Sequence, residues 1–580
     1  MTRATGNSNH GESGGARFIT VFRLVFPHLR PHGLRFAIGV IAGFGTGITM
    51  LALPWFAKQA VNVAAGNPVD LPMGRLLVYF FFLLILLAAC QFSNALISSR
   101  IANRVVADLR HEIFRCALRL PVTFHERRRS ADLVSVISAD AGFAQRLITF
   151  IIPAFLRHGP VLIVGLVYLF SASWRLTSLL SVAALLIMAL GLVVGRRLRV
   201  LGNAIQESLA RVAMTAQESF LGIRIIKTLS LESYFGERHD RRVDENKGLQ
   251  DRAVLYNALF HSLATVATVG LGGVTIWLGT RYVQRQQMDL GDLTAYSTFV
   301  FLVAAAGGTL ALSYIHMETV LGMAKRVSDL IGAEPEKSGS GGDPFRRCRG
   351  HLGFRGVSFT YPETDAGVHG VDLDFPPGEM TALTGPNGSG KTTLIKLALG
   401  LYELNSGHIL LDEHGAETVD RSLWRSQFGW LDREPTFFGL TIAEYIGLGK
   451  LGADRDAIVE AARTAEAHSF VEHLAKGYGT TIGEVGGNLS AGQRQRIALA
   501  QLVLHDPPVI LLDEALTSLD FGTEESLMER LRHLWKGRTV VVVTHRKETM
   551  DLTDRVVRMD AGRVVEIIEK QGLRTSLDSS

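Results

Sequence analysis

Six long runs of apolar residues dominate the first half of the chain. A helix needs about 20 apolar residues to cross a hydrocarbon core of about 30 Å, and each run approaches or exceeds that length. The pattern therefore predicts a helical membrane domain over residues 17–333. The predicted spans are Phe36–Ala57, Leu76–Leu96, Phe150–Phe170, Leu176–Val194, Ala253–Leu278 and Leu293–Tyr314.

The segment Arg17–Leu29, just before the first span, alternates apolar residues with arginines. This pattern predicts an amphipathic helix at the membrane surface. A helix of a soluble core is the alternative, and the adjacent span favours the membrane. Residues 1–16 are mostly polar and lack the apolar stretch and cleavage site of a secretory signal. We therefore expect a disordered cytosolic tail there.

Two connections between the spans, residues 98–145 and 196–252, are too long for ordinary loops. We expect them to extend the span helices into the cytosol. The first is rich in arginine, whereas the loop Asn62–Met73 has no lysine or arginine. By the positive-inside rule, both ends of the chain and the long connections face the cytosol. This places the protein in a membrane as a multi-pass protein, and we expect the bacterial plasma membrane.

Composition supports a membrane protein. Hydrophobic residues make up 47% of the chain, and the mean hydropathy is +0.21, which is too apolar for a purely soluble enzyme. The pI of about 9.1 would by itself allow nucleic-acid binding. However, the arginines cluster beside predicted spans, where anionic lipid headgroups are the nearer partner. We therefore expect contact with membrane lipid and no nucleic-acid partner.

The second half of the chain has a different pattern. Residues 334–346 are rich in glycine and predict a linker. From 347 to 568, short apolar runs alternate with helical ones, which predicts an α/β domain. Residues 569–580 predict a loose C-terminal tail. The three cysteines, Cys90, Cys116 and Cys348, stand far apart and suggest neither a zinc site nor a disulfide framework.

A glycine-rich loop in the α/β half predicts a phosphate site. It follows an apolar run and precedes a helical one, so its backbone N–H groups can surround an anion at the start of a helix. A chance glycine turn is the alternative. Lys391 is expected to reach the terminal phosphates of ATP, and the hydroxyl of Thr392 suits Mg²⁺. The expected nucleotide-binding residues of this loop are Gly385, Asn387, Gly388, Ser389, Gly390, Lys391, Thr392 and Thr393.

The run Val509–Glu514 supplies the second half of such a site. It reads as a buried strand that ends in two carboxylates. Asp513 is expected to bind Mg²⁺ together with Thr392, and Glu514 to act as the catalytic base that polarises the attacking water. The pair of motifs predicts a nucleotide site with Mg²⁺ and a candidate base, and the family resemblance given next implies an enzyme that hydrolyses ATP.

Leu489–Gln493 resembles the signature sequence of ABC ATPases, with alanine at its third position, where glycine is usual. In that family the signature contacts the ATP bound by the opposite ATPase domain, which implies nucleotide contacts for Ser490, Gly492 and Gln493. Gly483–Gly486 resembles a loop typical of ABC exporters. Three further residues match family positions: the adenine-stacking aromatic, the D-loop aspartate and the catalytic switch histidine. They are Tyr361, Asp520 and His545. Taken alone, Tyr361 could be a core residue and His545 an ordinary loop histidine.

The membrane half resembles type I (also called type IV) ABC exporters by its layout. Pro121–Phe124 and Gly222–Lys227 resemble the stretches that lead into the coupling helices, which dock on the ATPase domains in that family. One ATPase domain in the chain implies a half-transporter that pairs with a second copy of itself, a heterodimer being less favoured. The resemblance implies ATP-driven export of an amphipathic small molecule, a lipid or an antimicrobial peptide.

One position departs from the family pattern. The family has a glutamine eight residues before the Thr-Ile pair at Thr441, where this chain has Arg433. Because Mg²⁺ repels a guanidinium, we expect Arg433 to point away, leaving water or Glu434 near the metal. The substitution is the one feature that supports the alternative function, an ATP-gated or regulatory membrane protein with little hydrolysis.

Ionisable residues in or beside the spans predict part of the substrate path, since a charge in the bilayer is costly unless it faces water or a partner. Arg157 and His158 lie in the third run, and His316 and Glu318 follow the sixth. Extension of these side chains to the headgroups is the alternative. Gly39–Gly47 carries glycine at every fourth position, which permits close helix packing or reflects chance.

Overall fold

The computed structural model describes residues 14–66, 72–128, 130–339, 348–362, 364–483, 489–516 and 521–569. The chain divides into two compact units. The membrane unit contains Met1–Leu118 and Ala131–Ala333, and the ATPase unit contains Arg119–Ser130 and Glu334–Ser580. A helical membrane unit is thus followed by an α/β unit, which confirms the fold class.

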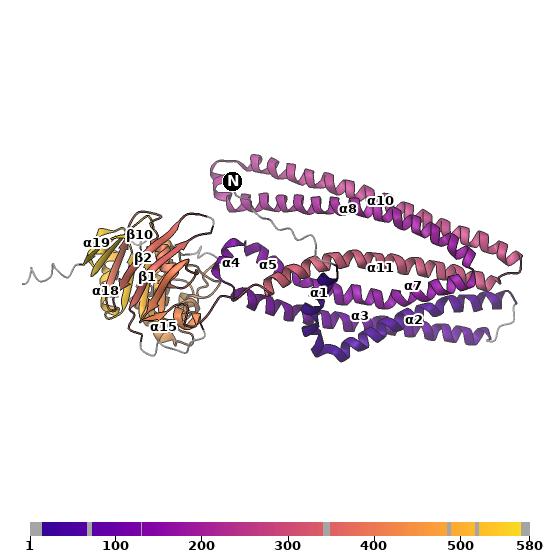
Figure 1. Cartoon of the computed structure of the whole chain (residues 1–580), viewed down its shortest axis with the longest axis horizontal. Coiled ribbons are helices and arrows are strands. Elements are labelled where there is room, and N and C mark those ends of the chain that lie inside the picture. Colours follow the sequence, from indigo (N-terminus) through magenta and orange to yellow (C-terminus); the bar gives the residue numbers. More distant parts are fainter. Residues whose placement is uncertain are drawn as a thin grey trace, which may run out of the picture. The chain divides into compact units, whose positions relative to one another are not determined.

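Long helices build the membrane unit (Figure 1). Each predicted span falls within one of them, apart from the start of the third, which lies in a π-helical turn. The long helices are α1 (Gly14–Leu29), α2 (Gly33–Ala64), α3 (Met73–Leu118), α7 (Ile152–Ala172), α8 (Trp174–Leu221), α10 (Glu232–Gln284) and α11 (Leu290–Ile331). The short ones are η1 (Arg30–His32), α5 (Ser130–Ser138), η2 (Asp140–Gly142), α6 (Phe143–Arg146), η3 (Leu147–Ile151) and α9 (Ile223–Thr228). The second long connection continues α8 and α10, as predicted, whereas the first continues α3 only to Leu118 and then runs through short helices toward α7.

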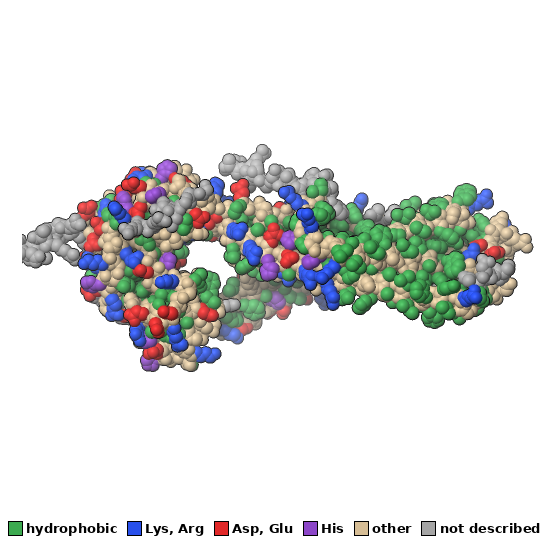
Figure 2. Space-filling view, turned by 90° about the horizontal axis from the view of Figure 1, so that it is seen from below, with side chains coloured by type: hydrophobic (Ala, Val, Ile, Leu, Met, Phe, Trp, Pro, Cys, Tyr) green, Lys and Arg blue, Asp and Glu red, His purple; other side chains and the backbone are tan. Residues whose placement is uncertain are grey.

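Four helical segments among the described residues are long and apolar enough to cross a membrane. The fourth and fifth predicted spans lie in α8 and α10, whose side chains are described only in part. Figure 2 shows hydrophobic side chains covering the surface of the long helices, as expected where lipid is the solvent. The four segments are Ile19–Ala64, Met73–Leu118, Asp132–Ala172 and Leu290–Ile331.

Glycines on one face of α2 let neighbouring helices approach closely. Gly39, Gly43 and Gly47 are all buried. A Cβ on Gly47 would lie 2.5 Å from the carbonyl oxygen of Arg157 on α7, and the amide of Asn94 on α3 donates to the carbonyl of Gly39 over 2.7 Å. The predicted close packing of this face is therefore confirmed.

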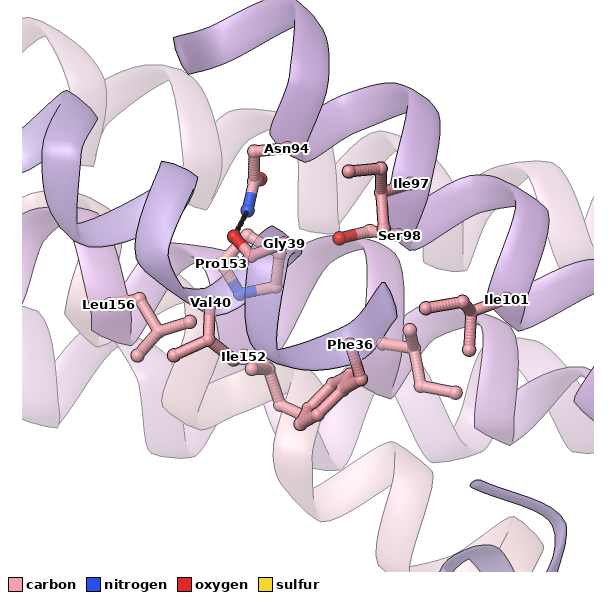
Figure 3. A pocket seen from close by; sticks show the side chains of 11 residues that line it. Phe36, Gly39, Val40, Asn94, Ile97, Ser98, Ile101, Ile152, Pro153 and Leu156 are labelled. Carbon is pink, nitrogen blue, oxygen red and sulfur yellow. Dashed lines mark hydrogen bonds between the residues drawn. The ribbon is translucent and has the colours of Figure 1, made fainter. Parts of the chain in front are cut away.

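Figure 3 shows a gap that this packing leaves between α2, α3 and α7. Its walls are mostly apolar, with Phe36 and Ile101 at one end and Leu156 at the other. The volume of about 10 Å³ is barely the room that one water molecule needs. It is a packing gap, too small to hold a transported molecule.

The ATPase unit is built on two sheets. An antiparallel sheet has the order β2-β1-β4-β5, and a six-stranded sheet has the order β10-β9-β3-β8-β7-β6. From β9 to β6 the second sheet is parallel, with β10 added antiparallel to β9. The strands are β1 (Leu352–Thr360), β2 (Gly367–Phe375), β3 (Met380–Thr384), β4 (Ser406–Leu411), β5 (His414–Gly415), β6 (Phe428–Leu431), β7 (Val509–Asp513), β8 (Thr539–Val543), β9 (Arg555–Asp560) and β10 (Arg563–Glu569).

The central strands β3, β7 and β8 are almost entirely buried, as their unbroken apolar runs predict. Because they are parallel, the residues that follow them gather at one edge of the sheet.

The helices of this unit are α4 (Val122–Arg127), α12 (Lys391–Ala398), α13 (Arg421–Arg425), α14 (Ile442–Gly447), α15 (Arg455–Thr464), α16 (His468–Glu472), η4 (Gly477–Gly479), α17 (Ala491–His505), α18 (Phe521–Leu534) and α19 (Lys547–Asp551).

Candidate nucleotide site

The phosphate loop connects β3 to α12 and depends on two glycines. Gly385 has φ of +144° and Gly390 has φ of +100°, values that favour glycine. A Cβ on Gly385 would clash with the backbone carbonyl of Met559, and one on Gly390 would lie 2.8 Å from Val368. The loop therefore brings backbone to the start of α12, where N–H groups can bind an anion.

Lys391 is held inside this loop with 6% of its surface exposed. Its Nζ donates to the carbonyl oxygens of Gly385 and Pro386 over 2.8 and 2.9 Å, and lies 3.4 Å from the hydroxyl of Ser389. Burial lowers the pKa of Lys391, while the nearby carboxylates of the site raise it. The amine thus stands at the start of α12, where phosphate oxygens can take over its hydrogen bonds.

Thr392 and Asp513 meet as the sequence predicts. The Thr392 hydroxyl donates to Oδ1 of Asp513 over 3.1 Å. Asp513 is 3% exposed, and burial raises the pKa of its carboxyl group. A hydroxyl and one carboxylate fit Mg²⁺, which usually takes one or two carboxylates plus substrate phosphates. No group of three or more His, Cys, Asp or Glu side chains that could hold a metal ion occurs in the described part of the chain, so phosphate and water would supply the remaining ligands.

Glu514 and His545 also come together. Glu514 follows β7 with φ of +48°, a strained value that concentrates at functional sites. Its Oε1 lies 3.4 Å from Nε2 of His545, and Glu514 is 19% exposed. The hydrogen bond from the Glu514 N–H to the carbonyl of Val543 fixes the backbone between β7 and β8.

Arg433 makes a contact that the sequence did not predict. Its Nη1 lies 3.1 Å from Oε2 of Glu514, so the guanidinium points at the carboxylate expected to act as the base, and its avoidance of Mg²⁺ stays a prediction. The reason is topological: β6 pairs with β7, with Leu431 beside Leu512, so the residues that follow both strands meet at the same sheet edge. The guanidinium is 67% exposed.

The side of the site where adenine is expected is aromatic. The ring of Tyr361 lies 4.9 Å from that of Phe359 and 5.5 Å from that of Tyr402, both edge to face. The Tyr361 hydroxyl is 3.4 Å from Oγ1 of Thr393. Tyr361 and Thr393 therefore lie together as predicted. Tyr402 was not predicted, because nothing in its local sequence marks it.

The signature residues stand at the start of α17. The backbone N–H of Gln493 donates to the Ser490 hydroxyl over 3.2 Å, and the Gln493 side chain accepts from the Ser490 N–H over 2.9 Å. This reciprocal cap satisfies two backbone donors of the helix. The hydrogen bonds of Ser490 in the described part of the chain thus stay within its own helix. Asp520 and residues 484–486 lie outside the described residues.

The four ionisable residues of the predicted substrate path are less constrained. The rings of His316 and Phe150 pack edge to face at 5.2 Å, and Glu318 is exposed. Arg157 and His158 are half-buried. Their role in a substrate path stays a prediction.

Comparison with known proteins agrees with this layout. Residues 36–306 match the family model of the ABC transporter transmembrane region, and residues 368–517 match the ABC transporter family model. The chain is 32% identical to the ATP-dependent lipid A-core flippase of Chromohalobacter salexigens, over 94% of each protein. It is 30% identical to the human mitochondrial potassium channel ATP-binding subunit, over 97% of this chain and 79% of that protein.

The same fold occurs in a solved structure. A bacterial Atm1-family ABC exporter with ATP bound superposes with a TM-score of 0.80 at 22% identity, covering 95% of this chain and 100% of that one. Fold, site and relatives agree, and the chain belongs to the ABC transporter family as a half-transporter, with an exporter-type membrane domain fused to an ATP-hydrolysing domain.

Proposed function

We propose that this half-transporter works as a homodimer that uses ATP to export an amphipathic small molecule, a lipid or a peptide across the bacterial plasma membrane. The observation that carries the proposal is the fusion of lipid-facing helices with a complete set of ATP-site groups, namely Lys391, the Thr392–Asp513 pair and Glu514. A chain with both parts can drive transport by hydrolysis.

Hydrolysis of ATP depends mainly on positioning and charge neutralisation. The loop N–H groups and Lys391 would bind the phosphates, and Thr392 and Asp513 would hold Mg²⁺, which supplies further positive charge when bound. Glu514 would accept a proton from the attacking water. His545, 3.4 Å from Glu514, would keep that carboxylate in place.

Support for a homodimer comes from the signature. Ser490 bonds within α17, and ABC signatures act on the ATP of the opposite domain. A second copy would supply that domain and give two identical ATP sites. Light scattering of the protein in detergent tests this, since a stable monomer that hydrolyses ATP would contradict the homodimer.

The relatives support a membrane substrate without fixing it. The bacterial relative is named as a flippase for a lipid, so an amphipathic lipid is the first substrate class to test. Its bacterial source supports the plasma membrane, although several relatives are named as mitochondrial.

A second candidate is the ATP-gated membrane protein. Two observations favour it: the Arg433–Glu514 ion pair, which places a cation on the catalytic base, and the name of the human relative, an ATP-binding subunit of a potassium channel.

Proteoliposomes separate the two functions. We expect the protein to move a fluorescent phospholipid between leaflets in the presence of Mg²⁺ and ATP, and Glu514→Gln to abolish this movement. Potassium flux that needs ATP binding and persists in Glu514→Gln, without lipid movement, would establish the second candidate.

The substrate path has its own test. His316→Ala and Glu318→Ala are expected to weaken the stimulation of ATPase activity by substrate while basal activity stays at the wild-type level. Unchanged stimulation in both variants would remove these residues from the path.

A further inference from the structure

Tyr402 stands where two sides of the nucleotide site converge. The phosphate-binding helix α12 ends at Ala398, four residues before Tyr402. The Tyr402 ring lies 5.5 Å from that of the adenine-side residue Tyr361 and 5.2 Å from that of Phe359. A displacement of the adenine base would therefore reach Tyr402 through the contacts between the rings. A displacement of the phosphates would reach Tyr402 through helix α12.

The other end of Tyr402 contacts helix α4, which belongs to the ATPase unit. Its hydroxyl donates to Oε1 of Glu126 over 2.6 Å. Tyr402 is 5% exposed, and burial together with the bond to Glu126 raises its pKa. The phenol therefore stays protonated, and the bond to the carboxylate is a short, charge-assisted one.

A second connection joins the end of α12 to the segment just before α4. Arg425 donates to the carbonyl oxygens of Leu399 and Gly400 over 3.2 and 2.9 Å, and it forms an ion pair with Glu336 in which Nη1 lies 2.9 Å from Oε2. The N–H of Glu336 donates to the carbonyl of Arg119, three residues before α4, over 2.9 Å. Two hydrogen-bonded routes thus link the end of α12 to the α4 segment.

We propose that Tyr402 is the positioning residue through which bound nucleotide fixes helix α4 of the same chain, with Glu126 as its partner. The inference rests on the proposed function, because it needs ATP at the Tyr361 and Lys391 positions. Tyr402 would give this chain a nucleotide-sensing contact on the adenine side of the site. On the metal side, the chain has Arg433 in place of the glutamine usual in the family.

Hydrogen exchange of full-length protein in lipid nanodiscs tests the proposal. The probe is AMP-PNP with Mg²⁺, and the quantity is the ratio of α4 exchange rates without and with nucleotide. We expect nucleotide to slow α4 exchange in the wild type by roughly tenfold, as one hydrogen bond to a charged group implies. Tyr402→Phe keeps the ring and loses only the hydroxyl, so its ratio should fall close to one.

Variants of Glu126, the residue that accepts the Tyr402 hydrogen bond, make the test more specific. Glu126→Ala should lose the effect to the same extent, and the double variant should lose no more than either single one, because both changes break one bond. Glu126→Gln keeps an acceptor oxygen and should retain most of the effect. Glu403→Gln, at an exposed carboxylate next to Tyr402, is the matched control and should behave like the wild type.

A merely structural bond gives a different result. In that case Tyr402→Phe speeds α4 exchange equally with and without nucleotide, the ratio stays at the wild-type value, and the proposal is overturned. No effect of nucleotide on α4 in the wild type, with AMP-PNP binding shown by calorimetry, overturns it too while leaving the ATP site intact. Failure of AMP-PNP to bind the wild type would overturn the proposed function, and this inference with it.

Discussion

Replacing Arg433 with glutamine should raise the basal rate of ATP hydrolysis. Arg433 and His545 approach different oxygens of Glu514, at 3.1 and 3.4 Å. A base whose oxygens are both engaged has less freedom to approach the attacking water. Arg433→Gln releases Oε2 and restores the residue usual in the family, and it leaves Lys391, Thr392 and Asp513 unchanged.

The structure limits the size of the effect. The guanidinium is 67% exposed, and exposed ion pairs are typically worth about 0.2 to 1 kcal/mol. At about 1.4 kcal/mol per tenfold change in rate, the expected increase in kcat is roughly 1.4- to 5-fold, with little change in KM for ATP. Salt screens exposed charges, so the wild-type rate should rise between low and moderate ionic strength, whereas the rate of the variant should not.

A coupled ATPase assay in nanodiscs at two salt concentrations measures both effects. Arg463→Gln is the matched control, since Arg463 forms an exposed ion pair with Glu460 on α15, away from the nucleotide site. A tenfold or greater loss of kcat in Arg433→Gln would refute the reasoning and show that the guanidinium assists hydrolysis. The same salt response in wild type and variant would show that the pair does not restrain Glu514.

Three further outcomes follow from the structure. Glu514→Gln should nearly abolish ATPase activity while nucleotide binding, measured by calorimetry, persists; near-wild-type turnover would exclude Glu514 as the base. Asp513→Asn should raise the melting temperature in EDTA at pH 7 by about 2–4 °C, because burial raises the pKa of Asp513 and its ionised form destabilises the fold as pH rises; an unchanged or lower value would contradict this. Gly47→Ala should cost about 1–3 kcal/mol by overpacking against α7, measured by thermal unfolding in detergent, whereas Gly159→Ala, with open space at its Cβ, is the control and should cost little; equal effects would count against close packing.

Local motifs explain why most of the candidate nucleotide site could be predicted. Lys391 and Thr392 are set by the loop they stand in, and Asp513 and Glu514 by the strand they end, so the sequence alone identifies each group. Thr392 follows β3 and Asp513 ends β7. Their contact over 3.1 Å is expected once these strands are taken to lie in one parallel sheet. The membrane spans were equally predictable, because length and apolarity in a bilayer are local properties.

Contacts that depend on strand order or chain crossing could not be predicted in this way. Arg433 reaches Glu514 because β6 lies beside β7, which the 80 intervening positions do not reveal. Tyr402 and Glu126 are separated by 276 positions, and their bond exists only because α4 docks on the end of α12. In both cases the local sequence identified one partner at most.

The glycine face of α2 has an evolutionary consequence. It locks α2 against α3 and α7, and α11 packs on α2 and α7 as well, so these four helices form a block with little tolerance for larger side chains. By contrast, α8 and α10 pack mainly on each other, as the separate hairpin in Figure 1 shows. Away from the contacts that Gly279 and Thr177 make with α11, substitutions on the hairpin leave the block intact, and related transporters should diverge in sequence faster there than on the glycine face of α2.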